Sequence, residues 1–98
     1  MDAVSGELVD RSRRRALVFL DEAENLANKG EHDVACFNAE QATQLYLKSV
    51  ILKIFGEIPR THSIGALLGY LADKLEEGYE EEGSRIRRFA ADNRDILV

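Results

Sequence analysis

Polar side chains interrupt the longest apolar segment of the chain, and they are the first candidates for chemistry. Gln41, Gln44 and Lys48 fall at positions where a simple core helix would carry Leu or Ala. Their spacing of i, i+3 and i+7 places them on one side of a helix, as a polar strip. A lysine ammonium can hold a phosphate, and glutamine amides can bind a base or a ribose. On its own, such a strip is more typical of a wet groove or an oligomer contact than of a catalytic site.

His62 is the second candidate. It follows Gly56, Pro59 and a short turn, and it directly precedes Ser63, which can cap a helix. An imidazole in this position can be aimed at a ligand. The alternative is that it only hydrogen-bonds the chain where the helix begins. The other histidine, His32, is thirty residues away on a different loop.

Sequence motifs for other chemistries are missing. The chain has no HExxH, paired CxxC, P-loop or GxGxxG spacing, and no serine or cysteine in a nucleophile-elbow context. We therefore expect no metal, no cofactor and no nucleophilic triad. The net charge of -5 and the pI near 5.0 argue against a nucleic-acid coat protein and against binding to an acidic membrane surface.

The same composition bears on the compartment. No apolar stretch reaches the roughly 20 residues that a membrane span needs, and the N-terminal residues lack the apolar core of a signal peptide. Cys36 is the only cysteine, so a disulfide within the chain is impossible. These features predict a cytoplasmic protein. Because Cys36 lies in an apolar helical stripe, we expect it to behave as a small buried hydrophobe.

The elements that must position these residues are all expected to be helices. The chain is rich in Ala, Leu, Glu, Arg and Lys, has one proline and shows no alternating β-branched run. Apolar periodicity predicts helices over about 7–28, 33–55 and 64–77, and from Ser84 onward. Gly30 and Gly56 are predicted to end the first two helices, and Asp33 and Ser84 to cap the second and the last. Short connections favour antiparallel neighbours. We therefore predict one all-α domain over residues 1–98, an antiparallel (up-and-down) four-helix bundle.

Apolar stripes indicate the faces that we expect to be buried. In the second helix the apolar coverage is wide, which indicates a central helix contacted on more than one side. Gly78 and Gly83 are expected to bracket an acidic turn before the last helix. The predicted stripes are Ala16, Leu20, Ala23 and Ala27; Cys36, Ala39, Thr43, Leu47, Val50 and Ile54; and Leu67, Leu68, Leu71 and Leu75.

The last residues of the chain are apolar. Ile96, Leu97 and Val98 are still in helical phase and carry no polar cap, whereas natural termini usually fray into polar residues. Two explanations stay open. Either these residues pack against a partner, or the sequence is truncated at its C-terminus.

Two consecutive segments resemble a known family. The stretch GEHDVACFNAEQATQLYLKS, followed by GEIPRTHSIGALL, resembles the HEPN domain (higher eukaryotes and prokaryotes nucleotide-binding) in its small prokaryotic and archaeal members. The resemblance covers about residues 16–75 and implies a HEPN-like helical bundle. Gln44 and Leu45 stand where the family usually has glutamate and lysine. The residues that match the family pattern are Gln41, Ala42, Lys48, Pro59, Thr61 and His62.

The resemblance also raises the question of catalysis. Many HEPN proteins are ribonucleases with an Arg-x4-6-His motif at a dimer interface. There the histidine handles the 2′-hydroxyl proton or the leaving oxygen, and the arginine holds the phosphate. Arg94 is the one candidate for a remnant of this motif, and its histidine would fall at position 99 or beyond. The sequence as given does not complete that catalytic site.

Three hypotheses for function follow. The first is a non-catalytic HEPN module that binds a nucleotide along Gln41, Gln44, Lys48 and His62. It would act as a homodimer or pair with a minimal nucleotidyltransferase, as in two-gene toxin–antitoxin modules. The second is a metal-independent ribonuclease toxin, acting on RNA, whose motif is incomplete in this sequence. The third is a structural bundle that only forms oligomers.

Overall fold

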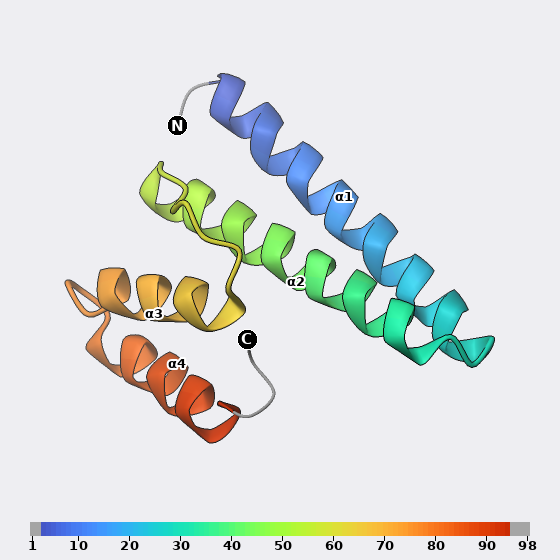
Figure 1. The fold of residues 1–98 in the computed structure, drawn as a ribbon. Helices are drawn as coiled ribbons and strands as arrows, with labels where there is room; N and C mark the ends of the chain where they lie inside the picture. The colour runs from blue at the N-terminus through green and yellow to red at the C-terminus, as the bar shows by residue number, and fades with distance from the viewer. Residues whose placement is uncertain (1–2, 95–98) are drawn as a thin grey trace. The chain divides into compact units, whose positions relative to one another are not determined.

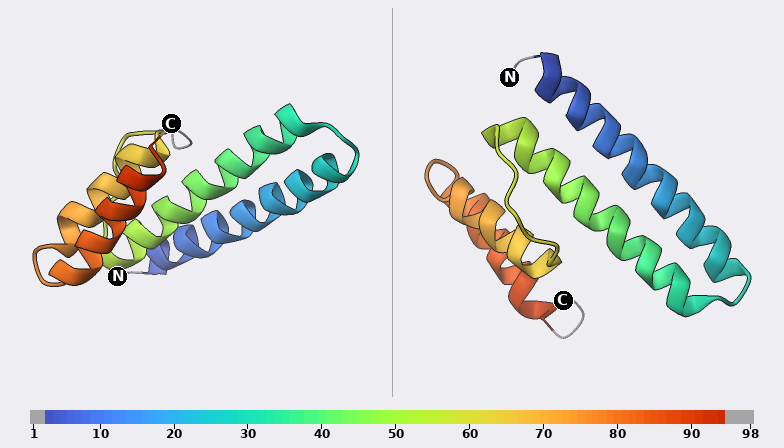
Figure 2. Two further views of the ribbon diagram at one scale, coloured as in Figure 1. Left: turned by 90° about the horizontal axis from the view of Figure 1, so that it is seen from below. Right: turned by 45° about the horizontal axis from the view of Figure 1, so that its top comes forward.

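The computed structural model describes residues 3–94, with side chains from residue 6, and within this range it contains four α-helices and no strand. They are α1 (Ala3–Asn28), α2 (His32–Phe55), α3 (Ile64–Leu75) and α4 (Glu80–Asp92), shown in Figure 1. The prediction of an all-α chain is therefore confirmed. The helices form two compact units, one ending at Gly56 and the other beginning at Glu57. Each unit is a hairpin of two antiparallel helices (Figure 2).

Small residues at seven-residue intervals hold the first hairpin together. On α1 the buried positions are Val9, Ala16 and Ala23, exposed by 4 to 6%. On α2 the matching positions are Ala35, Ala42 and Ser49, exposed by 1 to 7%. The two sets lie at equal distances from the turn, so each residue of one stripe is opposite one of the other. A seven-residue period keeps such a seam facing its partner, and small side chains allow a close approach of the two helices.

This packing leaves larger apolar residues of the hairpin in solvent. Leu17 is 64% exposed, Leu20 is 46% exposed and Ile54 is 55% exposed. The stripe that we predicted as the core of α2, from Cys36 to Ile54, lies about 90° round the helix from the buried alanines. That prediction was wrong, since Cys36, Thr43 and Ile54 are exposed and the other members are only half-buried. The reason is that the small residues of α1 are in phase with Ala35, Ala42 and Ser49 of α2.

Glycines end the helices of the first hairpin as predicted. Gly30 has φ 82° and follows α1, and Gly56 has φ 75° and caps α2, donating its N–H to the carbonyl of Leu52. A left-handed backbone at this position favours glycine. Asp33 is not the N-cap that we predicted, since α2 begins at His32. Asp33 instead lies in the first turn, where a carboxylate interacts favourably with the helix dipole.

The start of α3 follows its sequence signal closely. Ser63 is the N-cap, and its Oγ accepts a hydrogen bond of 3.2 Å from the N–H of Ala66. The predicted leucines Leu67, Leu68 and Leu71 are buried, whereas Leu75 is only half-buried. The helix ends at Leu75, two residues earlier than expected.

The start of α4 differs from our prediction. We expected Ser84 to cap this helix after an acidic turn, but α4 begins at Glu80 and Ser84 lies inside it. Three glutamates, Glu80 to Glu82, form its first turn, where negative charge stabilises the positive end of the helix dipole. Ile96 and Leu97, which we assigned to the last helix, fall outside the described residues, as does Val98.

Gly83 is buried in α4 because another helix lies very close to it. A Cβ at this position would be 2.9 Å from the backbone oxygen of Ala72 and 2.8 Å from Cγ of Glu76, both on the side of α3 that faces α4. Only glycine fits at that distance without a shift. Among the described residues, no helix has both the length and the apolar character needed to cross a membrane.

Candidate functional site

The predicted polar strip on α2 is largely covered. Gln44 is 7% exposed, and Gln41 and Lys48 are half-buried. Lys48 also interacts with another group of the protein. No fully buried side-chain nitrogen or oxygen in the described part of the chain lacks a hydrogen-bond partner. Ligand binding by this strip stays a prediction, and it would require access to a glutamine that the fold covers.

His62 lies in the second unit, in the segment that leads into α3. Its side chain is exposed, and it interacts with another group of the protein. The neighbouring Thr61 accepts a 3.2 Å hydrogen bond from the N–H of Ser63 through its Oγ1. The backbone around His62 is therefore fixed by the capping interactions of α3.

An open apolar groove runs along one edge of the first hairpin. One hollow is lined by residues of both helices, and a second hollow continues it toward the α1–α2 turn. We call the two together the edge groove. Its residues are Ala16, Leu17, Leu20, Ala42, Thr43, Tyr46 and Leu47 in the first hollow, and Ala23, Glu24, Ala27, His32, Ala35, Cys36 and Ala39 in the second.

Cys36 is exposed in the edge groove, which corrects its predicted burial. The helix turns its alanines toward α1, and Cys36 consequently lies on the neighbouring side of α2. Sequence reasoning named most of the α2 residues that line the groove, but it assigned them to the core. The signal that could have shown the groove was the excess of apolar residues on α2 relative to what one neighbouring helix can cover.

The first ionic cluster of the second unit holds the entering segment on α3. Glu57 accepts a hydrogen bond from the hydroxyl of Tyr70 and pairs with Nζ of Lys74 at 3.1 Å. The hydrogen bond from Tyr70, and then the ammonium of Lys74, lower the pKa of Glu57 below its usual 4.5. Glu57 in turn raises the pKa values of Tyr70 and Lys74 above 10.0 and 10.5. All three pKa values move further from neutral pH. These pKa shifts indicate that the cluster has a structural role, and they do not suit a general acid or base at neutral pH.

The second ionic cluster joins α4 to α3. Arg87 donates from Nε to Glu76 at 2.5 Å and also pairs with Asp73. The hydrogen bonds that Arg87 donates to Glu76, and then to Asp73, raise the pKa of Arg87 further above its ordinary value. Nε and Nη2 of the guanidinium are thus paired within its own hairpin. No group of three or more His, Cys, Asp or Glu side chains that could hold a metal ion occurs in the part of the chain that is described.

Comparison with protein families decides the assignment of the fold. The family model of the HEPN domain matches residues 9–95, nearly the whole chain. The chain belongs to the HEPN domain family. Comparison with curated proteins and with solved structures finds no match. The resemblance read from the α2 and α3 segments is therefore confirmed, and it extends further in both directions than the stretch that first suggested it.

In this HEPN domain the one candidate catalytic residue lies just after α4. Arg94 is exposed, and its N–H donates to the carbonyl of Ala91 at 3.4 Å. The positions that follow it lie outside the described residues. Its part in a ribonuclease motif stays a prediction, which the native gene sequence downstream of position 98 can test.

Proposed function

We propose that this HEPN domain is a non-catalytic binding module that takes up an apolar helix of another protein chain in its edge groove. The observation that carries the proposal is the exposure of large apolar side chains along that groove. Leu17 is 64% exposed and Tyr46 is 50% exposed. Burying such surface is favourable by roughly 25 cal/mol per Å², so a partner that covers it gains binding energy.

The shape and chemistry of the groove fit a helix. Between Cys36 and Leu47 it extends along α2 for about 16 Å, which is roughly three helical turns. Its lining on α2 is almost entirely apolar, with Thr43 and His32 as the polar members. A groove between two helices is a known receptor for the apolar face of a third helix. The candidate partners are a second HEPN chain and a minimal nucleotidyltransferase.

Cys36 provides a direct measure of whether the groove is occupied. It is the only cysteine of the chain and is exposed in the groove. We expect iodoacetamide to alkylate it several-fold more slowly when a partner is bound, because the partner covers the thiol. The measurement compares dilute protein with concentrated protein, and then with added purified nucleotidyltransferase. A matched control is C36S carrying a new cysteine at the exposed Ser84 of α4, whose rate should not change.

An unchanged Cys36 rate under both conditions would refute the proposal. Protection by the nucleotidyltransferase alone, or by the same chain alone, identifies which partner is taken up. We also propose a cytoplasmic location, since the single cysteine gives no disulfide within the chain.

Nucleotide binding is the second candidate function. A cation and an amide on one side of α2, Lys48 and Gln41, both keep part of their surface in solvent. With Gln44 they form the part of the predicted nucleotide set that lies on α2. Calorimetry with nucleoside mono-, di- and triphosphates tests this. We expect saturable heat that Lys48→Ala abolishes, and the absence of heat with every nucleotide would exclude the ligand.

A further inference from the structure

The net charge of the chain is concentrated at one end of the first hairpin. Residues 21–44, which surround the turn between α1 and α2, contain six carboxylates and a single lysine, Lys29. The six are Asp21, Glu22, Glu24, Glu31, Asp33 and Glu40. The whole chain has eighteen acidic and thirteen basic residues, so the other twelve of each kind cancel. This end of the hairpin therefore carries the entire net charge of -5.

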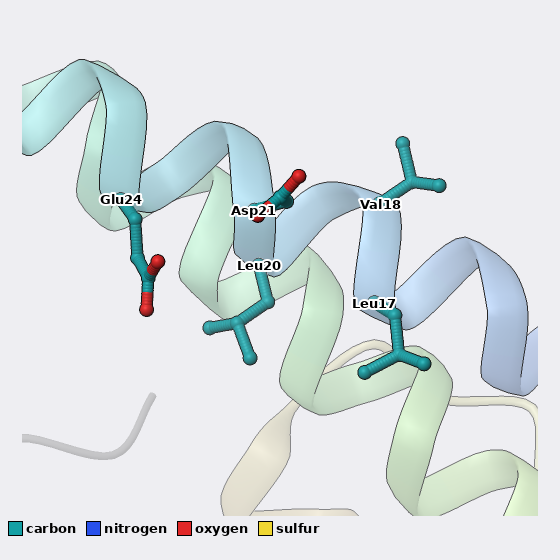
Figure 3. Close-up of a pocket in the computed structure, with 5 residues that line it drawn as sticks. All are labelled: Leu17, Val18, Leu20, Asp21 and Glu24. Atoms are coloured by element: carbon teal, nitrogen blue, oxygen red, sulfur yellow. The ribbon is translucent and has the colours of Figure 1, made fainter.

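Part of this negative charge lies in the edge groove on the α1 side. Glu24 lines the hollow nearer the turn. In Figure 3, Leu17, Leu20 and Glu24 project to the same side of α1. Asp21 shares with these three residues a hollow that borders the groove. Residues 11–15 of the same helix include four arginines, so the charge changes sign along α1 and is negative beside the turn.

Glu40 adds negative charge from the α2 side. It follows Cys36 by four residues and precedes Thr43 by three, so it lies on the side of α2 that lines the groove. Glu24 is exposed and Glu40 is half-buried. Among the residues that the structure describes, none forms an ion pair with either carboxylate. Both charges are therefore available to a bound partner.

The two hollows of the edge groove differ in charge. The described residues that line the hollow farther from the turn are all uncharged. The hollow nearer the turn contains Glu24 and His32 among its lining residues, and Glu40 lies beside it. A ligand that fills both hollows must therefore be apolar along its whole length and cationic at the end near the turn.

We propose that the edge groove takes up a basic amphipathic helix of a different protein. The apolar side of that helix lies in the groove, and its lysines or arginines lie beside Glu24 and Glu40. The inference rests on the proposed function and names the chemistry of the partner. An amphipathic helix in an apolar groove is a recurring mode of recognition, and complementary charge adds specificity and speeds association. Long basic side chains can cover apolar surface while their charged ends reach a carboxylate.

A basic helix fits this groove better than other occupants do. A nucleic acid or an anionic membrane surface would meet the most negative part of the chain and be repelled. A second copy related by a two-fold axis presents the same patch, which here is another hollowed and acidic surface. A basic amphipathic helix supplies both the apolar ridge and the positive charge that complement the groove.

Two synthetic peptides test the requirement for positive charge. Both are alanine-based, with about 15 residues, near the length at which an isolated helix becomes stable, and both carry leucines at i, i+3 and i+7. The basic peptide has lysines on both sides of the leucine stripe, and the acidic peptide has glutamates there. In fluorescence anisotropy the basic peptide should bind the chain about tenfold more tightly than the acidic peptide. It should also slow the alkylation of Cys36, which lies in the groove.

Charge reversal in the groove provides the decisive readout. The double variant Glu24→Lys, Glu40→Lys should bind the basic peptide about tenfold more weakly and the acidic peptide more tightly than wild type does. Unfolding cannot produce this exchange, because it would weaken the binding of both peptides. The matched control Glu22→Lys makes the same charge change at an exposed position of α1, about 200° round the helix from Glu24. It should keep the preference for the basic peptide.

Three results would overturn the inference. They are equal affinity for the two peptides, a double variant that keeps the wild-type preference, and protection of Cys36 by a high concentration of the chain alone, which would place a second copy in the groove. If neither peptide binds while nucleotidyltransferase protects Cys36, the proposed function stands and only this inference fails. A preference for the basic peptide that the double variant reverses and Glu22→Lys retains supports a basic helical partner.

Discussion

The two hairpins of this HEPN domain are stabilised in different ways. The first joins α1 and α2 through stripes of small residues and leaves large apolar side chains such as Leu17 in solvent. The second buries large aliphatic residues such as Leu67 and adds ionic contacts between α4 and α3. The first hairpin thus leaves large apolar side chains exposed, which we propose serve binding, while the second packs large side chains and pairs charges within itself.

This difference assigns separate roles to the two units. A close seam of small residues fixes the two long helices, and Ile51 and Leu52 of α2 are the large apolar side chains that are buried with it. Leu17, Leu20 and Tyr46 stay exposed and line the edge groove. In the second hairpin, by contrast, Arg87 and Glu57 are occupied within the unit. The comparison predicts that truncation, enlargement and titration affect the two hairpins differently.

Truncation of a large core residue should have the greatest effect. Leu67 is fully buried, so Leu67→Ala should lower the free energy of unfolding by about 2–5 kcal/mol. Phe37, on the first hairpin, is 58% exposed, and Phe37→Ala should change it by only about 0.5 kcal/mol. Urea unfolding followed by far-UV circular dichroism, at one protein concentration, measures both. Equal losses would contradict the difference in burial between Leu67 and Phe37.

Enlargement should instead damage the first hairpin. Ala42 is 6% exposed in the small-residue seam. Replacing it with leucine forces the helices apart, at a cost of about 1–3 kcal/mol. Ala66 on α3 is exposed, so Ala66→Leu should be close to neutral in the same unfolding measurement. A neutral Ala42→Leu would mean that the seam is not closely packed.

Enlargement should also destabilise the second hairpin at Gly83, where α4 approaches α3 closely. Gly83→Ala places a Cβ 2.9 Å from the carbonyl oxygen of Ala72, so we expect destabilisation of about 1–3 kcal/mol. Gly69 in α3 has no atom within 4 Å of the same added Cβ. Gly69→Ala should therefore stabilise the protein by roughly 0.5–1 kcal/mol, through better helix propensity. Thermal unfolding of both variants checks the sign, and the same sign for both would refute the close contact.

A change of pH should have the smallest effect on the free energy of unfolding. It should act through the ionisable groups of the second hairpin. The lowered pKa of Glu57 means that its stabilising contribution is complete above its ordinary value of 4.5 and is lost as the pH falls through the lowered pKa. Tyr70 and Lys74 have raised pKa values, so their contribution is lost only as the pH rises above 10. Glu57→Gln should flatten the acid side of the stability profile, measured by urea unfolding at a series of pH values. Glu31→Gln, at the exposed turn of the first hairpin, is the control and should leave the profile unchanged.

Much of the secondary structure could be read from local signals. Gly30 and Gly56 were recognised as helix ends, because a left-handed backbone there favours glycine. Ser63 was recognised as a cap from its position before an apolar run. The start of α4 was missed because Ser84 was preferred to the acidic first turn, although both are ordinary signals of a helix start. Local signals compete in such places, and here the acidic residues, not Ser84, mark the start of the helix.

The candidate site was harder to predict than the helices. Four α2 residues of the edge groove were named from the sequence, but as part of a core stripe: Cys36, Ala39, Thr43 and Leu47. Apolar residues surround α2 on nearly every side, so hydrophobic periodicity could not indicate which side meets α1. Gln44 shows the same difficulty, since it was assigned to an open strip and is 7% exposed.

The sequence by itself determined the helical class, most helix ends and the HEPN family, because propensity, capping and motif spacing act over a few residues. The charge order along α1 is equally a property of the sequence. Only the tertiary structure decided which side of each helix is buried. The stripes of α1 and α2 had to be small and in phase with each other, and that match exists between two helices and cannot be read from either one alone. It is this match that leaves Leu17, Cys36 and Tyr46 exposed.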